Sequence, residues 1–190
     1  ILSYIYYLIT SIRNFLYDKE ILPIHRVPGV EVICIGNITV GGTGKTPAVQ
    51  YFTKRLQKMG RKVAVISRGY RGKRKREPLL VSDGYEIFAT ARESGDEPYI
   101  HALNLNVPII VSSDRYKGCL FAKKHFGVDT IVLDDGFQHR KLFRDRNIVL
   151  IDATNPFGWG QLLPAGMLRE DFKKAAKRAT EFIITKSDLV

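Results

Sequence analysis

A glycine-rich stretch at residues 36–46 constrains the fold more than any other feature of this chain. The apolar run Val32-Ile33-Cys34-Ile35 leads into it, Gly44-Lys45-Thr46 closes it, and a helical pattern follows. Strand, glycine-rich loop and helix in this order are typical of a phosphate-binding loop. Glycines let successive backbone N–H groups turn toward one anion, and the dipole of the helix points at the same anion. We therefore predict a nucleotide site here.

The residues of this loop have separate predicted roles. Lys45 is expected to reach the β- and γ-phosphates, and the Thr46 hydroxyl is expected to ligate Mg²⁺. The backbone around the phosphates would come from Thr39, Val40, Gly41, Gly42, Thr43 and Gly44. Thr39 stands where the usual G-x-x-x-x-G-K-[ST] pattern has its first glycine. The alternative, a glycine-rich turn with a chance Gly-Lys-Thr, does not account for the flanking strand and helix.

Apolar runs of strand length alternate with helical patterns along the rest of the chain. We expect strands at residues 62–66, 107–112, 130–133, 147–152 and 182–185, and helices at residues 48–59, 97–105 and 114–125. Strands joined by helices form parallel sheets with right-handed crossovers. We therefore predict a doubly wound, mostly parallel α/β sheet of the P-loop NTPase kind. Residues 79–81 and 85–88, with Asp83-Gly84 between them, predict a small β-hairpin insertion.

Residues 1–20 are predicted to form an amphipathic helix, and we assign 1–22 to a separate N-terminal segment ahead of a domain at 23–190. The apolar stripe of this helix consists of Ile1, Ile5, Leu8, Ile9, Ile12, Phe15 and Leu16. Only 12 uncharged residues precede Arg13, fewer than the roughly 20 that span a bilayer. Two interpretations remain open. The helix lies in a membrane interface with its tyrosines at headgroup depth, or it packs on its own domain.

The chain is strongly basic, which suits an anionic partner. Thirty basic and 19 acidic residues give a net charge of +11. The run Arg71–Arg76 is either a solvated loop, the commoner fate of such runs, or a clamp for phosphate or anionic lipid. No recognition motif for nucleic acid accompanies it, so we expect no nucleic-acid partner, and we infer no obligate protein partner. The two cysteines, Cys34 and Cys119, favour a reducing compartment.

Two further motifs point to a nucleotide, and one of them indicates a guanine base. Asp134 and Asp135 end an apolar strand, where they would lie beside the phosphate loop and hold Mg²⁺ directly or through water. Thr185-Lys186-Ser187-Asp188 fits the [NT]-K-x-D pattern by which GTPases recognise guanine. This second motif supports an alternative function, a GTPase of the switch or metallochaperone type. Val40 disfavours the partition ATPases, which carry a lysine at that position.

Asp96 precedes a predicted helix, and Pro98 falls in the first turn of that helix. A side-chain oxygen at this position commonly accepts a backbone N–H, so we predict that Asp96 caps the helix.

Six short sequence blocks occur in a characteristic order, at residues 40–47, 67–70, 95–98, 114–116, 134–140 and 163–170. Together they closely resemble the tetraacyldisaccharide 4′-kinase family of lipid A biosynthesis, over nearly the whole chain. The blocks Asp-Asp-Gly-Phe-Gln-His and Leu-Pro-Ala-Gly-Met-Leu-Arg-Glu are the most specific, and Thr39 is normal for this family. The resemblance implies transfer of the γ-phosphate of ATP, with Mg²⁺, to the 4′-hydroxyl of tetraacyldisaccharide 1-phosphate, forming lipid IVA. It also implies action at the cytoplasmic face of the inner membrane of a Gram-negative-type bacterium, on an anionic membrane surface.

The resemblance implies roles for single residues as well. The expected catalytic residues are Lys45, Asp96, Arg169 and Glu170. Asp96 matches the proposed base, and Arg169 and Glu170 match a pair near the γ-phosphate, where an arginine would neutralise charge on the equatorial oxygens. The residues expected to bind the lipid are Asn37, Arg68, Tyr70, Arg115, Gln138 and His139. In the family a histidine partner of Asp96 lies in a later segment, so we expect a kinase domain that is incomplete at its C-terminus.

Overall fold

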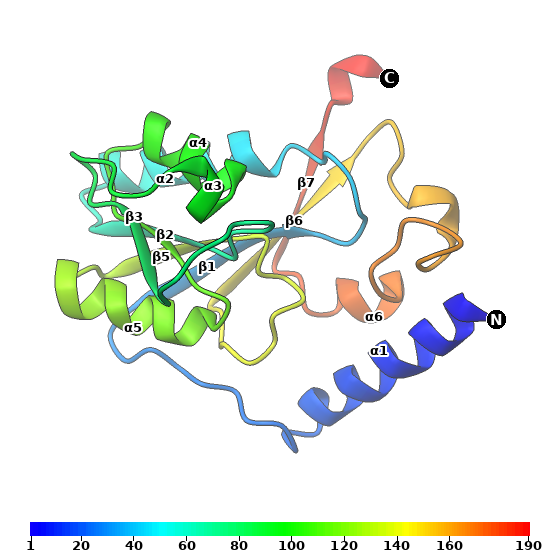
Figure 1. Ribbon diagram of the computed structural model, residues 1–190. Helices are drawn as coiled ribbons and strands as arrows, with labels where there is room; N and C mark the ends of the chain where they lie inside the picture. Colours follow the sequence, from blue (N-terminus) through cyan, green and yellow to red (C-terminus); the bar gives the residue numbers. More distant parts are fainter.

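Seven strands form one sheet, and the strand that leads into the phosphate loop lies inside it (Figure 1). The computed structural model describes residues 1–190. The strands are β1 (Glu31–Asn37), β2 (Val63–Ser67), β3 (Leu79–Ser82), β4 (Ile109–Val111), β5 (Thr130–Asp134), β6 (Arg146–Asp152) and β7 (Glu181–Thr185). Their order across the sheet is β3-β4-β2-β5-β1-β6-β7. Every neighbouring pair is parallel except β3 and β4, which confirms the predicted α/β fold.

Helices cover both faces of this sheet (Figure 1). The helices that follow the loop are α2 (Lys45–Lys58), α3 (Ala91–Ser94), α4 (Asp96–Asn104), α5 (Arg115–Phe126) and α6 (Phe172–Ala176). One apolar core joins the sheet to α2 and α4, and the other joins it to α5 and α6. Alternate residues of β1 divide between the cores, because successive side chains of a strand point to opposite faces. Burial on both faces explains why the strands are continuous apolar runs in the sequence.

The junction before α4 differs from the sequence prediction. Gly95, not Asp96, occupies the cap position, and Asp96 is the first helical residue with no capping hydrogen bond from its side chain. Gly95 has a φ of 91°, and a Cβ at this position would lie 2.7 Å from the Tyr70 carbonyl oxygen. Only glycine fits here, because other residues are strained at this φ and would collide with the neighbouring loop. The prediction that Asp96 caps the helix is therefore wrong.

The predicted hairpin forms only in part. β3 pairs antiparallel with β4 at the edge of the main sheet, whereas residues 85–88 contribute a single bridge from Ile87 to Ser82. Most of the backbone pairing of β3 is therefore with β4, and not with residues 85–88, which follow β3 in the sequence. The short helices α3 and α6 and the 3₁₀ segments Gly158–Gly160 and Ser187–Leu189 were not predicted. Each is too short to show the periodicity on which helix prediction depends.

The N-terminal helix α1 (Leu2–Asp18) confirms the predicted helix, and it lies beside α6 rather than on either face of the sheet (Figure 1). Its apolar side chains point outward. The exposed ones are Ile1, Leu2, Ile5, Leu8, Ile9, Ile12 and Phe15. Its polar side faces the protein, and Asn14 is its one buried residue. No helix in the structure is both long enough and apolar enough to span a membrane.

Candidate active site

The candidate site forms along the edge of the sheet at which the parallel strands end. β1 ends at Asn37, β2 at Ser67, β5 at Asp134 and β7 at Thr185. Because these strands run in the same direction, the loops that follow them gather at one edge, where open α/β sheets bind ligands. Three of the six sequence blocks, at residues 40–47, 67–70 and 134–140, begin at or just after these strand ends.

The phosphate loop, residues 38–44, leaves the start of α2 open to an anion. Gly44 is the N-cap with a φ of 78°, no side chain caps α2, and its first turn holds no acid. Helix N-termini of this kind bind phosphate. Asn37 Nδ2 donates to Thr43 Oγ1 at 2.9 Å, and Thr185 Oγ1 donates to the Thr43 carbonyl at 3.1 Å. The phosphate-loop cavity, about 400 Å³, is lined by residues 41–47 together with Glu97 and Lys186.

The two acids after β5 point to different partners. Asp134 is 1% exposed, accepts a hydrogen bond from Ser67 Oγ at 3.2 Å, and lies 3.4 Å from His101 Nε2. Asp135 is only half-buried, and its carboxylate accepts from Arg169 Nη1 at 3.0 and 3.1 Å. Asp134 thus bonds β2 and lies against α4, whereas Asp135 is bonded by the loop that carries Arg169.

Glu97, for which the sequence predicts no role, joins this group from the first turn of α4. The pKa of its carboxyl is raised, first by partial burial and then by the negative charge of Asp134, while Lys45 acts in the opposite direction. Glu97 therefore lies within electrostatic reach of Lys45, Asp134 and Asp135. Its place directly after Asp96 is the one sequence signal that would have identified it.

The residues predicted to hold Mg²⁺ fit that ion only together with a nucleotide. No group of three His, Cys, Asp or Glu side chains in the structure is arranged to hold a metal ion by itself. Mg²⁺ in nucleotide sites is usually held by one or two carboxylates, with phosphate oxygens and waters as the other ligands. Asp134 and Asp135 supply two carboxylates, and Thr46 at the start of α2 adds a hydroxyl oxygen.

A second cavity, which we name the Asp96 cavity, opens beside the first. It measures about 540 Å³ and is lined by Tyr70, Arg71, Lys73, Ala91, Arg92, Gly95, Asp96, Glu97 and Pro98. Its lining includes two members of the basic run, Arg71 and Lys73, so part of that run faces a cavity. Arg74 instead is half-buried and pairs with Glu77. Glu97 lines both this cavity and the phosphate-loop cavity.

A third cavity is strongly cationic. This arginine cavity, about 270 Å³, is lined by Arg13, Arg68, Ser113, Arg115, Asp135, Gln138, His139 and Arg169, with no apolar residue among them. Burial lowers the pKa of the Arg115 guanidinium, and the positive charge of Arg68 lowers it further. Burial, followed by the charge of Arg115, lowers the pKa of His139 to about 4. His139 is therefore neutral at pH 7, and the arginines provide the charge that would attract an anion.

The arginine cavity brings together four of the six residues predicted to bind the lipid, namely Arg68, Arg115, Gln138 and His139. Of the other two, Tyr70 lines the Asp96 cavity. Asn37 is fully buried, and its side chain holds the phosphate loop through Thr43. Arg13 comes from α1, and no motif in the sequence indicated that it would lie here.

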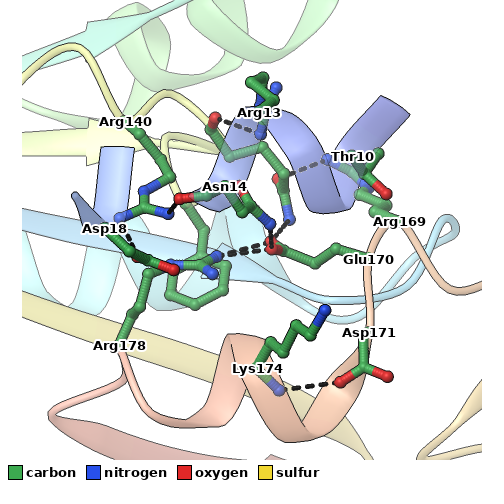
Figure 2. A network of polar contacts seen from close by, with 12 residues as sticks. Thr10, Arg13, Asn14, Asp18, Arg140, Arg169, Glu170, Asp171, Lys174 and Arg178 are labelled. Atoms are coloured by element: carbon green, nitrogen blue, oxygen red, sulfur yellow. Dashed lines mark hydrogen bonds and ion pairs between the residues drawn. The ribbon is translucent and has the colours of Figure 1, made fainter. Parts of the chain in front are cut away.

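Arg169 and Glu170, predicted as a pair near the γ-phosphate, point in different directions. Arg169 contacts Asp135, but Glu170 is 1% exposed and accepts from Arg178 Nη2 at 2.7 Å at each carboxylate oxygen. Figure 2 shows Glu170 between Asn14 and Arg178. Glu170 therefore lines none of the three cavities and instead bonds Asn14 and Arg178 beneath the site.

The guanine-type motif is engaged in other contacts. Thr185 holds the phosphate loop, Lys186 pairs with Asp152, and Asp188 lies in the exposed 3₁₀ segment. The contacts of Thr185 and Lys186 account for these residues without a guanine base.

Comparisons with known proteins agree on one family. The family model described as Tetraacyldisaccharide-1-P 4′-kinase matches residues 1–189. The tetraacyldisaccharide 4′-kinase of Halothermothrix orenii is 46% identical over 189 residues, which are 98% of this chain and 48% of that protein. The same-named protein of Syntrophus aciditrophicus is 46% identical over 175 residues, 92% of this chain and 46% of its own length. The chain thus spans about half the length of these curated relatives.

A solved structure gives the same result. The crystal structure of LpxK from Aquifex aeolicus in complex with ATP superposes with a TM-score of 0.90 at 43% identity, covering 99% of this chain and 58% of that chain. The relatives and this structure do not favour the GTPase alternative.

Proposed function

This chain belongs to the Tetraacyldisaccharide-1-P 4′-kinase family, and on that premise we propose that the intact protein transfers the γ-phosphate of ATP to the 4′-hydroxyl of tetraacyldisaccharide 1-phosphate, forming lipid IVA. The observation that carries this proposal is the position of Glu97, which lines both the phosphate-loop cavity and the Asp96 cavity. A phosphate donor and an acceptor hydroxyl bound in these two cavities would meet at one place, as phosphoryl transfer requires.

The phosphate-loop cavity would hold ATP. Backbone N–H groups of residues 39–44 and the start of α2 surround the phosphates, and Lys45 follows the γ-phosphate as charge develops on it. Thr46, Asp134 and Asp135 would hold Mg²⁺, which supplies further charge stabilisation when it is bound. The bonds from Ser67 to Asp134 and from Arg169 to Asp135 keep both carboxylates in place before the nucleotide arrives.

Asp96 would act as the general base in the neighbouring cavity. An exposed carboxylate at the first helical residue can orient a sugar hydroxyl and take its proton as the phosphoryl group is transferred. The family resemblance assigns Asp96 a histidine partner, and no histidine lines the Asp96 cavity in this chain. Glu97 and the basic residues Arg71, Lys73 and Arg92 would complete the walls around the sugar.

The arginine cavity suits an anionic group of the lipid disaccharide. Arg115 is 4% exposed, and burial and the charge of Arg68 keep its pKa below the ordinary arginine value, so a bound anion would relieve their repulsion. Neutral His139 and the Gln138 amide add hydrogen-bonding capacity without adding charge. We assign Arg68, Arg115, Gln138 and His139 to recognition of this lipid head.

The outward face of α1 would lie on an anionic membrane, at the cytoplasmic face of the inner membrane. A row of exposed apolar side chains, Ile5, Leu8, Ile9, Ile12 and Phe15, faces away from the protein. Such a face gains free energy by entering the headgroup boundary, and a net charge of +11 adds attraction to anionic lipid.

A transfer assay on the intact protein tests this proposal. Tetraacyldisaccharide 1-phosphate in mixed detergent micelles is incubated with Mg²⁺ and γ-labelled ATP or GTP, and the labelled lipid is separated and counted. We expect labelled lipid from ATP and at most a few per cent of that rate from GTP. Nucleotide hydrolysis without label on the lipid would refute the proposal.

A further inference from the structure

The helix α1 packs with its polar side inward, the reverse of an ordinary surface helix. Its outward apolar face is exposed, and it is attached to the rest of the chain by hydrogen bonds rather than by an apolar seam. Asn14 is 4% exposed and is the only buried residue of the helix. Binding to a membrane would need only the outward apolar side chains of α1. The buried polar contacts on its inward side therefore need a separate explanation.

Three side chains of α1 bond the two loops that carry the arginine cavity and the catalytic acids. Asn14 Nδ2 donates to Glu170 Oε2 at 2.9 Å, and Tyr6 Oη donates to the Arg169 carbonyl at 2.8 Å. Arg13 Nη2 donates to the Gln138 carbonyl at 3.2 Å. The helix therefore bridges the loop after β5 and the loop before α6, which lie far apart in sequence.

The Asn14 contact is the most enclosed of the three (Figure 2). Glu170 is 1% exposed, and its donors are Asn14, Arg178 and, more distantly, Gln138 Nε2 at 3.4 Å. Arg140 Nη1 in turn donates to the Asn14 carbonyl at 2.9 Å, and Arg140 pairs with Asp18 at the end of α1. Without Asn14, Glu170 Oε2 would keep only Arg178 as a donor, and a buried acceptor that loses a donor favours a carboxylate orientation set by the remaining ones.

The orientation of Glu170 affects the catalytic acids through its neighbour in the chain. Arg169 is covalently next to Glu170, and its Nη1 donates to Asp135 Oδ2 at 3.0 Å and to Gln138 Oε1 at 3.3 Å. Gln138 Nε2 donates to the Asn37 carbonyl at 2.9 Å, at the start of the phosphate loop. A continuous path of bonded groups therefore runs from Asn14 to Asp135 and to the loop.

We propose that Asn14 is a positioning residue of the catalytic centre, so that phosphoryl transfer requires α1 to be docked on the loops that carry Asp135, Gln138 and Arg169. The proposal rests on the kinase function proposed above. In it α1 has two faces with two tasks, since the outward face meets the membrane and the inward face sets the geometry of the site.

The transfer assay in detergent micelles tests the proposal in the intact protein, because attachment to vesicles does not limit the rate there. For Asn14→Ala we expect kcat to fall tenfold or more, with KM for ATP changed by less than about threefold, since no residue of this path lines the phosphate-loop cavity. Asn14→Asp keeps the shape but replaces the donor with a second carboxylate against Glu170, so its kcat should fall at least as far. Tyr6→Phe removes a single hydrogen bond and should lower kcat by about two- to fivefold.

Asn104→Ala is the matched control, because Asn104 is an exposed asparagine in the last turn of α4 and lines none of the three cavities. Its kcat should equal that of the wild type. If the wild type labels the lipid but Asn14→Ala and Tyr6→Phe keep kcat within twofold, the positioning role is refuted while the kinase function stands. If kcat falls only together with ATP affinity and melting temperature, Asn14 acts on folding alone, which also refutes it. A wild type that labels no lipid refutes the kinase function itself.

Discussion

Replacing Asp96 with asparagine separates the chemistry of this carboxyl from its contribution to folding. The structure limits the folding effect, because Asp96 is exposed, is the first helical residue of α4 and makes no capping bond. The substitution removes only the attraction between a carboxylate and the helix N-terminus, about 0.3–1 kcal/mol. For a domain of this size that shifts the melting temperature by about 1–4 °C. As a general base, however, Asp96 would be worth roughly 10²–10⁴ in rate, since asparagine cannot accept the proton.

The expected result is therefore a folded protein that binds ATP and transfers almost no phosphate. ATP binding should be unaffected because the phosphate-loop cavity is lined by residues 41–47, Glu97 and Lys186, and not by Asp96. Kinetics of lipid labelling, a thermal melt and an ATP titration on the intact protein measure the three quantities separately. Asp83→Asn is the control, because Asp83 is a half-buried acid that lines none of the three cavities, and its Oδ1 accepts from Tyr85 N and Glu86 N, bonds that asparagine retains.

Two results would contradict this reasoning. If Asp96→Asn retained more than about a tenth of the wild-type rate, the loss would be smaller than general-base catalysis predicts, and another group would have to take the proton. If the variant melted more than about 10 °C lower, the exposed position of Asp96 would not describe its role in the fold.

Other predictions follow from the same structure. Lys45→Ala should lower the transfer rate by about 10²–10³, because one preorganised contact to the developing charge is lost; turnover within threefold of wild type would show that the loop does not carry the chemistry. His139 has its pKa lowered from 6.5 to about 4, so the folded protein should lose stability as pH falls from 6.5 toward 4. Between pH 7 and pH 5, the free energy of unfolding in urea should fall less for His139→Gln than for the wild type. Equal falls would contradict the lowered pKa of His139. Replacing Ile5 and Ile9 with serine should release the protein from anionic vesicles in a sedimentation assay, and wild-type binding should weaken as salt rises; unchanged sedimentation of the variant would mean that this face does not bind membrane.

The sequence by itself determined the parts of the site that are continuous in the chain. A strand, a glycine-rich loop and a helix that adjoin one another must form a phosphate loop locally, so residues 36–46 and the acids Asp134 and Asp135 were predicted from their own neighbours. The central strands were predicted equally well, because strands buried on both faces are continuous apolar runs. The strand at β3 was predicted but its partner was not, because β4 follows only after α3 and α4.

Only the tertiary structure decided which of these residues share a cavity and in which direction each points. Arg13, Arg68, Arg115 and Arg169 come from four separate segments. The strand order brings the last three to one sheet edge, and the packing of α1 adds Arg13. Adjacent residues also diverge, because Arg169 turns to Asp135 while Glu170 turns to Arg178 and Asn14.

The helix α1 also divides between what the sequence predicts and what only the tertiary structure decides. Helical spacing in the sequence predicted an apolar stripe, but a stripe alone is equally consistent with packing on the domain and with exposure. The fold settled the orientation for a physical reason. The loops beneath α1 offer a buried carboxylate and two carbonyl oxygens that need donors, and the polar side of the helix supplies them through Asn14, Tyr6 and Arg13.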